Sequence, residues 1–191
     1  EQLNLHYTLR ITDRSGVYTD KSLTVTITGS NDKPDVTLGT GNTNTAFLSE
    51  SNATLSSSGT LTVSDIDRTN IVNSARTLVV SGSSNRNDPA APTDAELLSM
   101  LTLTANPILS ATEQSDTLTW TFDSNITTSK DTAFNYLRKG ETLVLTYTVT
   151  ATDNDATPLS GSNTVTITIT GTNDTPDITG GADTAALTET D

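Results

Sequence analysis

The chain has 191 residues, of which 23 are Asp or Glu and 10 are Lys or Arg, so its formal net charge is −13 and its pI is near 4.2. This charge argues against nucleic acid and anionic membranes as partners, because both are bound through clustered Lys and Arg. There is no Cys, which excludes disulfides and thiolate metal sites. No segment approaches the ~20 consecutive apolar residues of a transmembrane helix, so we expect no direct membrane insertion.

Threonine dominates the composition. Only 32% of the residues are hydrophobic, a fraction that by itself is typical of disordered chains. The chain also contains 41 Thr, however, and Thr is β-branched and suits the half-buried surface of a sheet. We therefore expect a β protein with many Thr side chains on the outer faces of its strands.

Alternation of apolar and polar residues predicts a series of strands. In chain order they lie at 3–12, 23–27, 61–63, 118–122, 143–149 and 165–169. The alternation is one-sided, which is the pattern of antiparallel sheets with one buried face, and it predicts a β-sandwich. It also places four aromatic residues on inward positions: Tyr7, Trp120, Phe122 and Tyr147.

One short helix interrupts the strands. Thr93 and Glu96 have the spacing of a capping box, and Leu97, Leu98 and Leu101 form an apolar stripe ahead of a strand at Leu103. The segments 39–45 and 81–92 are rich in Gly, Ser, Asn and Pro and are predicted loops.

Three ordered matches indicate an internal repeat of about 140 residues. Residues 3–13 match 143–153, the Asn-Asp pair at 31–32 matches that at 173–174, and 46–50 match 185–189. We therefore divide the chain into the C-terminal strands of a preceding repeat (1–33), one complete repeat (34–175) and the start of the next (176–191). No basic and apolar leader opens the chain at Glu1, so we expect an internal piece of a longer tandem array.

The first two strands, within 3–28, present apolar faces whose repeat lies mostly outside this sequence. Exposed strands of this kind need a partner or they aggregate. Two explanations remain open: these strands pair with another chain, or the boundary of the folded domain differs from the boundary of the repeat.

Acidic residues gather in short motifs at predicted strand ends. These are Asn31-Asp32, Glu50, Asp65-Ile66-Asp67, Asp153-Asn154-Asp155 and Asn173-Asp174. Carboxylate, amide and carbonyl oxygens are the ligands of calcium, whereas Asp and Asn are also common turn formers. Their recurrence at both ends of one predicted domain favours calcium.

Other chemistries have weaker support. His6 is the only histidine and falls on an outward strand position, which disfavours a zinc site and a Ser-His-Asp triad. A carboxylate-pair glycosidase would present aromatic residues to a sugar, but only Phe134 and Tyr136 lie in a loop-like stretch, and we expect them to close one end of the sandwich. We do not expect an enzyme.

Three segments carry a family resemblance. Residues 58–67 (SGTLTVSDID), 133–155 (AFNYLRKGETLVLTYTVTATDND) and 164–178 (TVTITITGTNDTPDI) resemble the VCBS-type repeats of giant bacterial surface adhesins, a group close to bacterial cadherin-like and RTX-adhesin extender domains. The resemblance implies an immunoglobulin- or cadherin-like sandwich, secretion to the bacterial cell surface, and a spacer role in cell adhesion and biofilm formation. It also implies neighbouring repeats as partners, with calcium at the junctions between them.

The resemblance also implies a set of calcium ligands. Asn31, Asp32, Asp65, Asp67 and Asp153 resemble the ligands of one junction, and Glu50, Asn173 and Asp174 those of the next. The Asp-Arg-Glu motif of cadherins is absent, so we expect fewer ions per junction. The alternative is a calcium-dependent module that binds a glycan or protein at its loops.

Overall fold

The computed structural model describes residues 2–104, 106–125 and 134–176 and contains ten strands and one helix within them. In chain order the elements are β1 (Gln2–Thr12), β2 (Tyr18–Thr28), β3 (Asp35–Thr37), β4 (Thr45–Ser49), β5 (Ser56–Ser64), β6 (Asn73–Gly82), α1 (Asp94–Ser99), β7 (Leu101–Leu103), β8 (Ser115–Asp123), β9 (Thr142–Thr152) and β10 (Ser160–Thr170). The predicted start of a following repeat at 176–191 lies outside the described residues, apart from Pro176.

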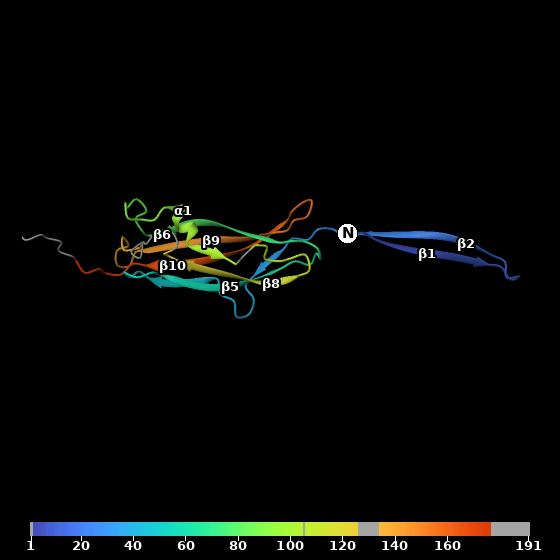
Figure 1. Cartoon of the computed structure of the whole chain (residues 1–191), viewed down its shortest axis with the longest axis horizontal. Helices are drawn as coiled ribbons and strands as arrows, with labels where there is room; N and C mark the ends of the chain where they lie inside the picture. The colour runs from blue at the N-terminus through green and yellow to red at the C-terminus, as the bar shows by residue number, and fades with distance from the viewer. Residues whose placement is uncertain (1, 105, 126–133, 177–191) are drawn as a thin grey trace, which may run out of the picture.

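Two four-stranded sheets pack face to face to form a sandwich (Figure 1). One has the strand order β3-β5-β8-β7 and the other the order β4-β10-β9-β6. All pairs are antiparallel except β4 with β10, which is parallel. With β3 as strand A, these orders correspond to the A-B-E-D and C-F-G sheets of the immunoglobulin fold. The predicted immunoglobulin-like β-sandwich is confirmed.

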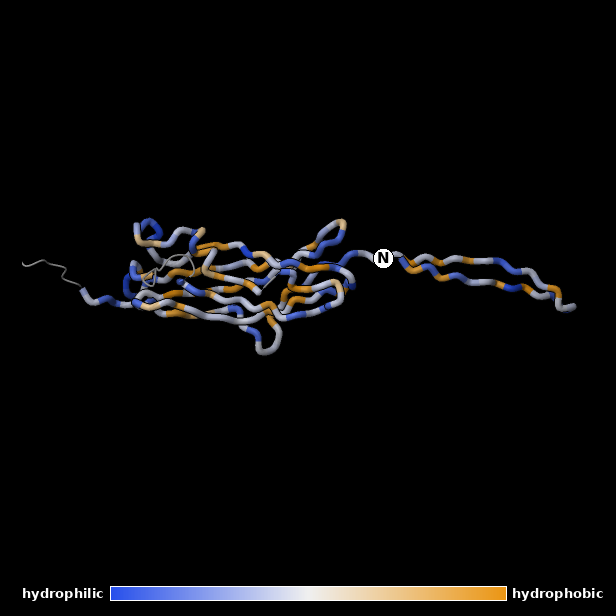
Figure 2. The backbone as a smooth tube through the Cα atoms, in the orientation of Figure 1, coloured by the Kyte–Doolittle hydropathy of each residue, from blue (hydrophilic) through white to orange (hydrophobic). Residues whose placement is uncertain are grey.

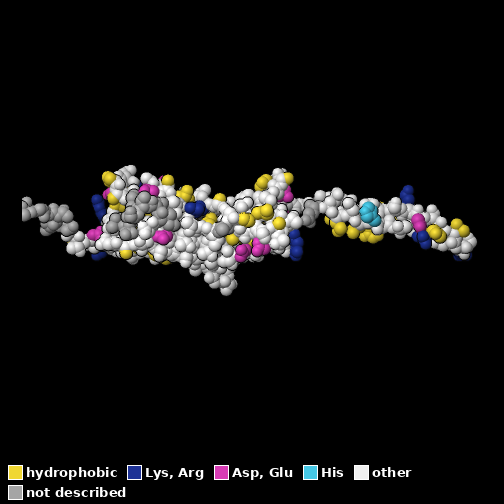
Figure 3. Space-filling model, viewed as in Figure 1, with side chains coloured by type: hydrophobic (Ala, Val, Ile, Leu, Met, Phe, Trp, Pro, Cys, Tyr) yellow, Lys and Arg dark blue, Asp and Glu magenta, His cyan; other side chains and the backbone are white. Residues whose placement is uncertain are grey.

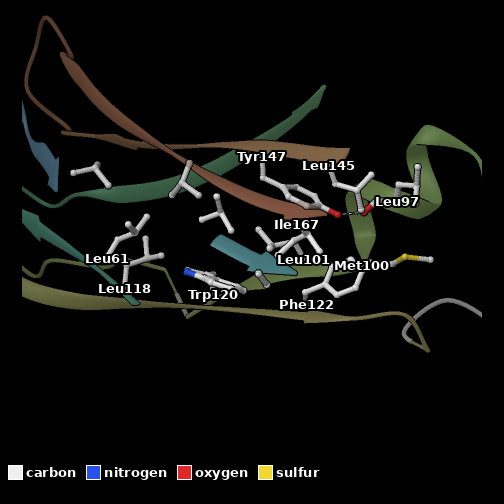
Figure 4. Packing of buried hydrophobic residues seen from close by; sticks show 14 of the residues in the cluster. Leu61, Leu97, Met100, Leu101, Leu118, Trp120, Phe122, Leu145, Tyr147 and Ile167 are labelled. Carbon is white, nitrogen blue, oxygen red and sulfur yellow. Dashed lines mark hydrogen bonds between the residues drawn. The ribbon is translucent and has the colours of Figure 1, made fainter. Parts of the chain in front are cut away.

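The core fills the space between the inner faces of the sheets (Figure 4). The predicted inward residues of β5, β8, β9 and β10 are fully buried, including Leu61, Trp120 and Tyr147. The Trp120 indole N–H donates to the carbonyl of Thr43 at 2.8 Å, which satisfies its one polar atom. Gly59 lies opposite Trp120 in the register, and a Cβ there would collide with the indole ring. A glycine on β5 therefore makes room for the largest core side chain.

Strand β6 is the long element that sequence alternation does not predict. It pairs with β9 along ten residues and forms an edge of its sheet. Its inward positions are polar in the first half of the strand, at Ser74 and Arg76, and apolar in the second half, at Leu78 and Val80. Ser74 and Arg76 hydrogen-bond to Asn106 and to the carbonyl of Leu98, so tertiary contacts satisfy the polar half of the strand.

The helix begins as predicted. The Thr93 hydroxyl accepts from the Glu96 backbone N–H, and the Glu96 carboxylate accepts from the Thr93 backbone N–H at 2.7 Å, so the capping box is confirmed. The predicted stripe was too long, because Leu101 belongs to β7 and only Leu97 is buried within the helix. The Tyr147 hydroxyl donates to the Leu97 carbonyl at 2.7 Å and ties the helix to β9 (Figure 4). None of the described helices is long and apolar enough to span a membrane.

Strands β1 and β2 form a hairpin that projects from one end of the sandwich, and residues 171–176 leave the opposite end (Figure 1). Apolar and polar residues alternate along the hairpin (Figure 2). On its polar face, Arg10 forms a bidentate pair with Asp20 at 2.8 Å and lies 3.7 Å above the Tyr18 ring. The predicted inward position of Tyr7 is wrong for this structure, because the residue is 50% exposed and no second sheet among the described residues covers it.

Tyr7 and Tyr147 are counterparts in the repeat and provide a matched pair of variants. We expect Tyr147→Phe to lower the free energy of unfolding by about 1 kcal/mol, because it removes the hydroxyl donor from the Leu97 carbonyl, which keeps only the Met100 backbone N–H at 3.2 Å. Tyr7→Phe should change it by less than about 0.5 kcal/mol, because the ring is half-exposed. Denaturant titration measures both, and equal effects would contradict the tethering role of Tyr147.

Candidate metal site

Three loops bring acidic residues together at the end of the sandwich nearest the hairpin. Asp65 and Asp67 follow β5, Asp153 follows β9, and Asn31 and Asp32 lie in the linker between β2 and β3. The antiparallel register explains this meeting, because the start of β3 pairs with the end of β5 through Asp35 and Ser64. The turn after β9 is closed by the Asp153 backbone N–H, which donates to the Leu159 carbonyl at 3.1 Å.

Hydrogen bonds connect the linker to the acidic loops. The Asn31 side-chain amide donates to Oδ2 of Asp153 at 3.1 Å, and the Asp32 backbone N–H donates to Oδ2 of Asp67 at 2.6 Å. The Asn70 side-chain amide donates to Oδ1 of Asn31 at 3.1 Å. The structure therefore brings together all five residues predicted for the first junction.

Asp65 differs from the rest of the cluster in having a buried carboxylate oxygen without a hydrogen-bond partner. Its side chain is only 4% exposed, its Oδ1 accepts from the Asp67 backbone N–H at 2.9 Å, and its Oδ2 is buried without a partner. Burial raises the pKa of this carboxyl above its ordinary value of 3.8, and the charges of Asp67, Asp153 and Asp32 raise it further, against the effect of the Asp67 N–H. An orphaned carboxylate oxygen among like charges is an unfavourable arrangement that a cation would relieve.

Two open grooves adjoin the cluster. One, of about 550 Å³, runs beside Asp32, Asp65 and Ile66. The other, of about 260 Å³, runs beside Asn31, Asp67 and Asp155. Asp32 and Asp67 are therefore reachable from solvent, whereas Asp153, like Asp65, is only 4% exposed.

Basic residues do not neutralise the cluster. Within the described part of the chain, Asp65, Asp67 and Asp153 form no salt bridge, and the nearby Lys33 pairs with Asp35 at 2.9 Å on the exposed surface. Across residues 2–104, 106–125 and 134–176, no group of three Asp, Glu, His or Cys side chains has the spacing of a ready-made metal site. N–H donors from Asn31 and Asp32 occupy carboxylate oxygens that a metal ion would otherwise contact.

A smaller polar site lies at the opposite end of the sandwich. Glu50 is 2% exposed, and its Oε2 accepts from the Thr172 hydroxyl at 2.8 Å and from the Thr172 backbone N–H at 3.2 Å. Its Oε1 is buried without a partner. The predicted neighbours Asn173 and Asp174 are exposed and form no hydrogen bond with Glu50 among the described contacts, so Thr172 takes the place expected for them.

Sequence reasoning missed three polar residues of these sites. Thr172 directly precedes the Asn173-Asp174 motif, and Asn154 lies within an acidic motif, where it accepts from the Ile71 backbone N–H at 2.8 Å. Asn70 carries no local signal, because it joins the site only through the fold of the loop after β5. In that loop Thr69 adopts a φ of 81°, a conformation that β-branched residues rarely occupy.

The aromatic residues that a sugar site would need belong to the core instead. Phe134 is 3% exposed and Tyr136 packs against the core cluster, so the prediction that they close an end of the sandwich is confirmed. The predicted loops 39–45 and 81–92 contain no aromatic residue.

No protein-family model and no curated protein sequence matches the chain. Among solved structures, the chain is similar to the ASH/PapD-like domain of human CEP192 (PapD-like domain 7), with 9% sequence identity and a TM-score of 0.39. The match covers 78% of this chain and 92% of that domain. At this level of similarity no function passes from that domain to this chain.

The raised pKa of Asp65 predicts a pH-dependent stability. The Asp65 carboxyl binds its proton more tightly in the native state than in the unfolded chain. The free energy of unfolding therefore falls as the pH rises from about 4 through the raised pKa, and the ionised carboxylate destabilises the native state above it. We therefore expect Asp65→Asn to raise the melting temperature in chelator at pH 7, and the gain to disappear at pH 3.

Thermal unfolding at both pH values measures this difference. Asp88→Asn is the matched control, because it removes a carboxylate from the loop that follows β6 at the other end of the sandwich. A similar gain in the control at pH 7 would attribute the effect to net charge and contradict the local explanation.

Proposed function

We propose that the chain is a structural extender of a large secreted bacterial surface adhesin, in which calcium stiffens the junctions between repeats. The observation that carries the proposal is Asp65, a buried carboxylate with one orphaned oxygen among three other carboxylates and no cationic partner. Hard oxygen ligands in a flexible loop setting are what calcium requires, and Zn²⁺ would lack its usual His and Cys ligands here.

We propose that the acidic loops at the hairpin end of the sandwich close around a calcium ion, since the described carboxylates offer the right ligand type but do not have the spacing of a ready-made site. Carboxylates of Asp65, Asp67 and Asp153 would provide most of the charge, and Asp32 and the Asn31 carbonyl oxygen would complete the set. Bound calcium would supply charge neutralisation, which favours the arrangement that brings these loops together. Asn31 and Asp32 belong to the linker, so their participation would restrict the angle between the linker and the sandwich.

Equivalence between the two linkers supports a composite junction. Residues 29–34 (GSNDKP) and 171–176 (GTNDTP) are counterparts, and Thr172 corresponds to Ser30. The linker at 29–34 contacts the sandwich that follows it, through Asp67 and Asp153. The linker at 171–176 contacts the sandwich that precedes it, through Glu50. In a tandem array, one linker would therefore meet a buried glutamate upstream and an aspartate cluster downstream.

The overall charge explains why stiffening needs a cation. A chain with a net charge of −13 repels its neighbours in an array, and a linker without counterions would flex. Extracellular calcium sites have dissociation constants of about 10⁻⁴–10⁻³ M, which suffice where calcium is millimolar. The proposed roles in adhesion and biofilm formation, and the location at the bacterial surface, rest on the VCBS resemblance of residues 58–67, 133–155 and 164–178.

The extender explains the arrangement better than a calcium-dependent glycan- or protein-binding module does. Of the two loop aromatics that would contact a sugar, Phe134 is buried in the core, and Tyr136 is partly buried against it while also lining a groove beside Thr172. The neighbouring repeats are therefore the partners that we propose, and we propose no catalytic activity.

Calcium should stabilise the sandwich. With about 10 mM calcium and the affinities above, mass action predicts a gain of about 1.4–2.7 kcal/mol, or about 3–10 °C in melting temperature. Asp65→Asn and Asp67→Asn should abolish most of the rise, and Asp88→Asn should keep it. Calorimetry in calcium, magnesium and chelator tests this, and superimposable curves in all three would remove calcium from the function.

Calcium should also stiffen the linker. The protein has no Cys, so Ser22→Cys on β2 and Ser58→Cys on β5 provide unique sites for spin labels on exposed outer faces. We expect calcium to narrow the distribution of distances between the labels by about half. The same pair in the Asp67→Asn background is the control, and an unchanged distribution in the parent protein would contradict the stiffening role.

A further inference from the structure

The β1–β2 hairpin repeats the pairing of β9 and β10 residue for residue. All four strands have eleven residues. Gln2 pairs with Thr28 in the hairpin, and Thr142 pairs with Thr170 in the sandwich. These pairs are related by the same offsets, 140 and 142 residues, that relate the repeated sequences. The hairpin is therefore in the register of the two central strands of a complete sandwich.

The apolar face of the hairpin corresponds to the core face of β9 and β10. Leu3, Leu5, Tyr7 and Leu9 of β1 take the positions of Leu143, Leu145, Tyr147 and Val149, and Leu23, Val25 and Ile27 of β2 take those of Val165, Ile167 and Ile169. The sandwich residues are all 0% exposed, whereas Tyr7 is 50%, Leu9 55% and Ile27 52% exposed. Figure 3 shows hydrophobic side chains along the hairpin.

The sandwich shows what covers such a face. β9 and β10 pack their inner side chains against Leu61, Leu118, Trp120 and Phe122 of the opposite sheet. Their outer edges pair with β6 and, in parallel, with β4. In the described structure the hairpin has neither kind of partner, because β1 and β2 pair only with each other.

We propose that the hairpin completes an immunoglobulin-like sandwich formed by a repeat of the same kind directly upstream in the polypeptide. The occupant of its apolar face is the inner face of that repeat's A-B-E-D sheet, with apolar and aromatic residues at the positions of Leu61, Trp120 and Phe122. The free edges of β1 and β2 receive the counterparts of β6 and β4. The inference rests on the tandem-repeat part of the proposed function and is independent of calcium.

The correspondence is closest in the half of the hairpin next to the linker. Toward the turn, Lys21 replaces Asn163 and Thr19 replaces Gly161. A Cβ at Gly161 would collide with the Pro34 carbonyl, so the segment corresponding to Pro34 must pass farther from Thr19. The docked surface therefore centres on Leu3–Leu9 and Leu23–Ile27.

An extended chain tests the proposal directly. Residues 34–141 are joined ahead of residues 2–191, so that the hairpin follows a copy of β3–β8 at the position where β9 follows them in the sandwich. Amide hydrogen exchange of the hairpin is measured in chelator in the parent and extended chains. We expect exchange at Tyr7 and Val25 to slow by about 100-fold or more in the extended chain, because local opening would then require unfolding of a sandwich.

Two substitutions in the hairpin of the extended chain separate docking from general stabilisation. Val25→Asp, on the apolar face, should abolish the protection, whereas Thr24→Asp, on the polar face, should preserve it. Equal exchange in the parent and extended chains, or equal effects of the two substitutions, would overturn the proposal. So would a parent chain that sediments as a dimer with its hairpin amides already protected.

The same measurements distinguish this inference from the calcium proposal. Hairpin protection in chelator together with calcium-independent melting would uphold docking and overturn the calcium junction. Calcium-dependent melting without protection of the hairpin amides in the extended chain would uphold the calcium junction and overturn docking.

Discussion

One apolar face runs along each of the strands β1, β2, β5, β8, β9 and β10, and the need to cover that face governs the rest of the structure. In the sandwich, β9 and β10 bury their inner side chains completely against the opposite sheet. In the hairpin, the same sequence pattern in the same register leaves residues such as Tyr7 half-exposed. The same arrangement of side chains therefore forms part of a core in the sandwich and the proposed docking surface in the hairpin. The two differ only in whether a second sheet covers them.

The ends of the sandwich follow from the same constraint. The acidic motifs lie at strand ends, and antiparallel pairing brings the loops after β5 and β9 to one end of the sandwich. Asp65 is buried there beside other carboxylates, and Glu50 is buried at the opposite end. Buried carboxylates without cationic partners are unfavourable in isolation, so both ends are poised for a partner, which we propose to be calcium together with a neighbouring repeat.

Much of the fold and part of the site were predictable from local pattern. Alternation identified the strands that carry the core, and the Thr93–Glu96 spacing identified the helix. The pattern did not predict β6, because Ser74 and Arg76 occupy its inward positions, and their hydrogen bonds to Asn106 and to the Leu98 carbonyl exist only in the folded protein. At the first junction the predicted residues do meet, because each follows a strand end. At the second, Thr172 reaches Glu50, because Asn173 is one residue farther and points the opposite way in extended backbone, and Asp174 lies two residues farther along the departing chain.

Composition, alternation and the offsets between repeated segments were sufficient to predict a β-sandwich, a repeat period and the acidic motifs at the strand ends, because these properties depend on local spacing. The register of the hairpin, the burial of Asp65 and the partner of Glu50 were decided only by tertiary structure, because each depends on which strands become neighbours. The exposed face of Tyr7 is the clearest case. Its alternation is that of a buried strand, and burial requires a second sheet that local sequence cannot provide.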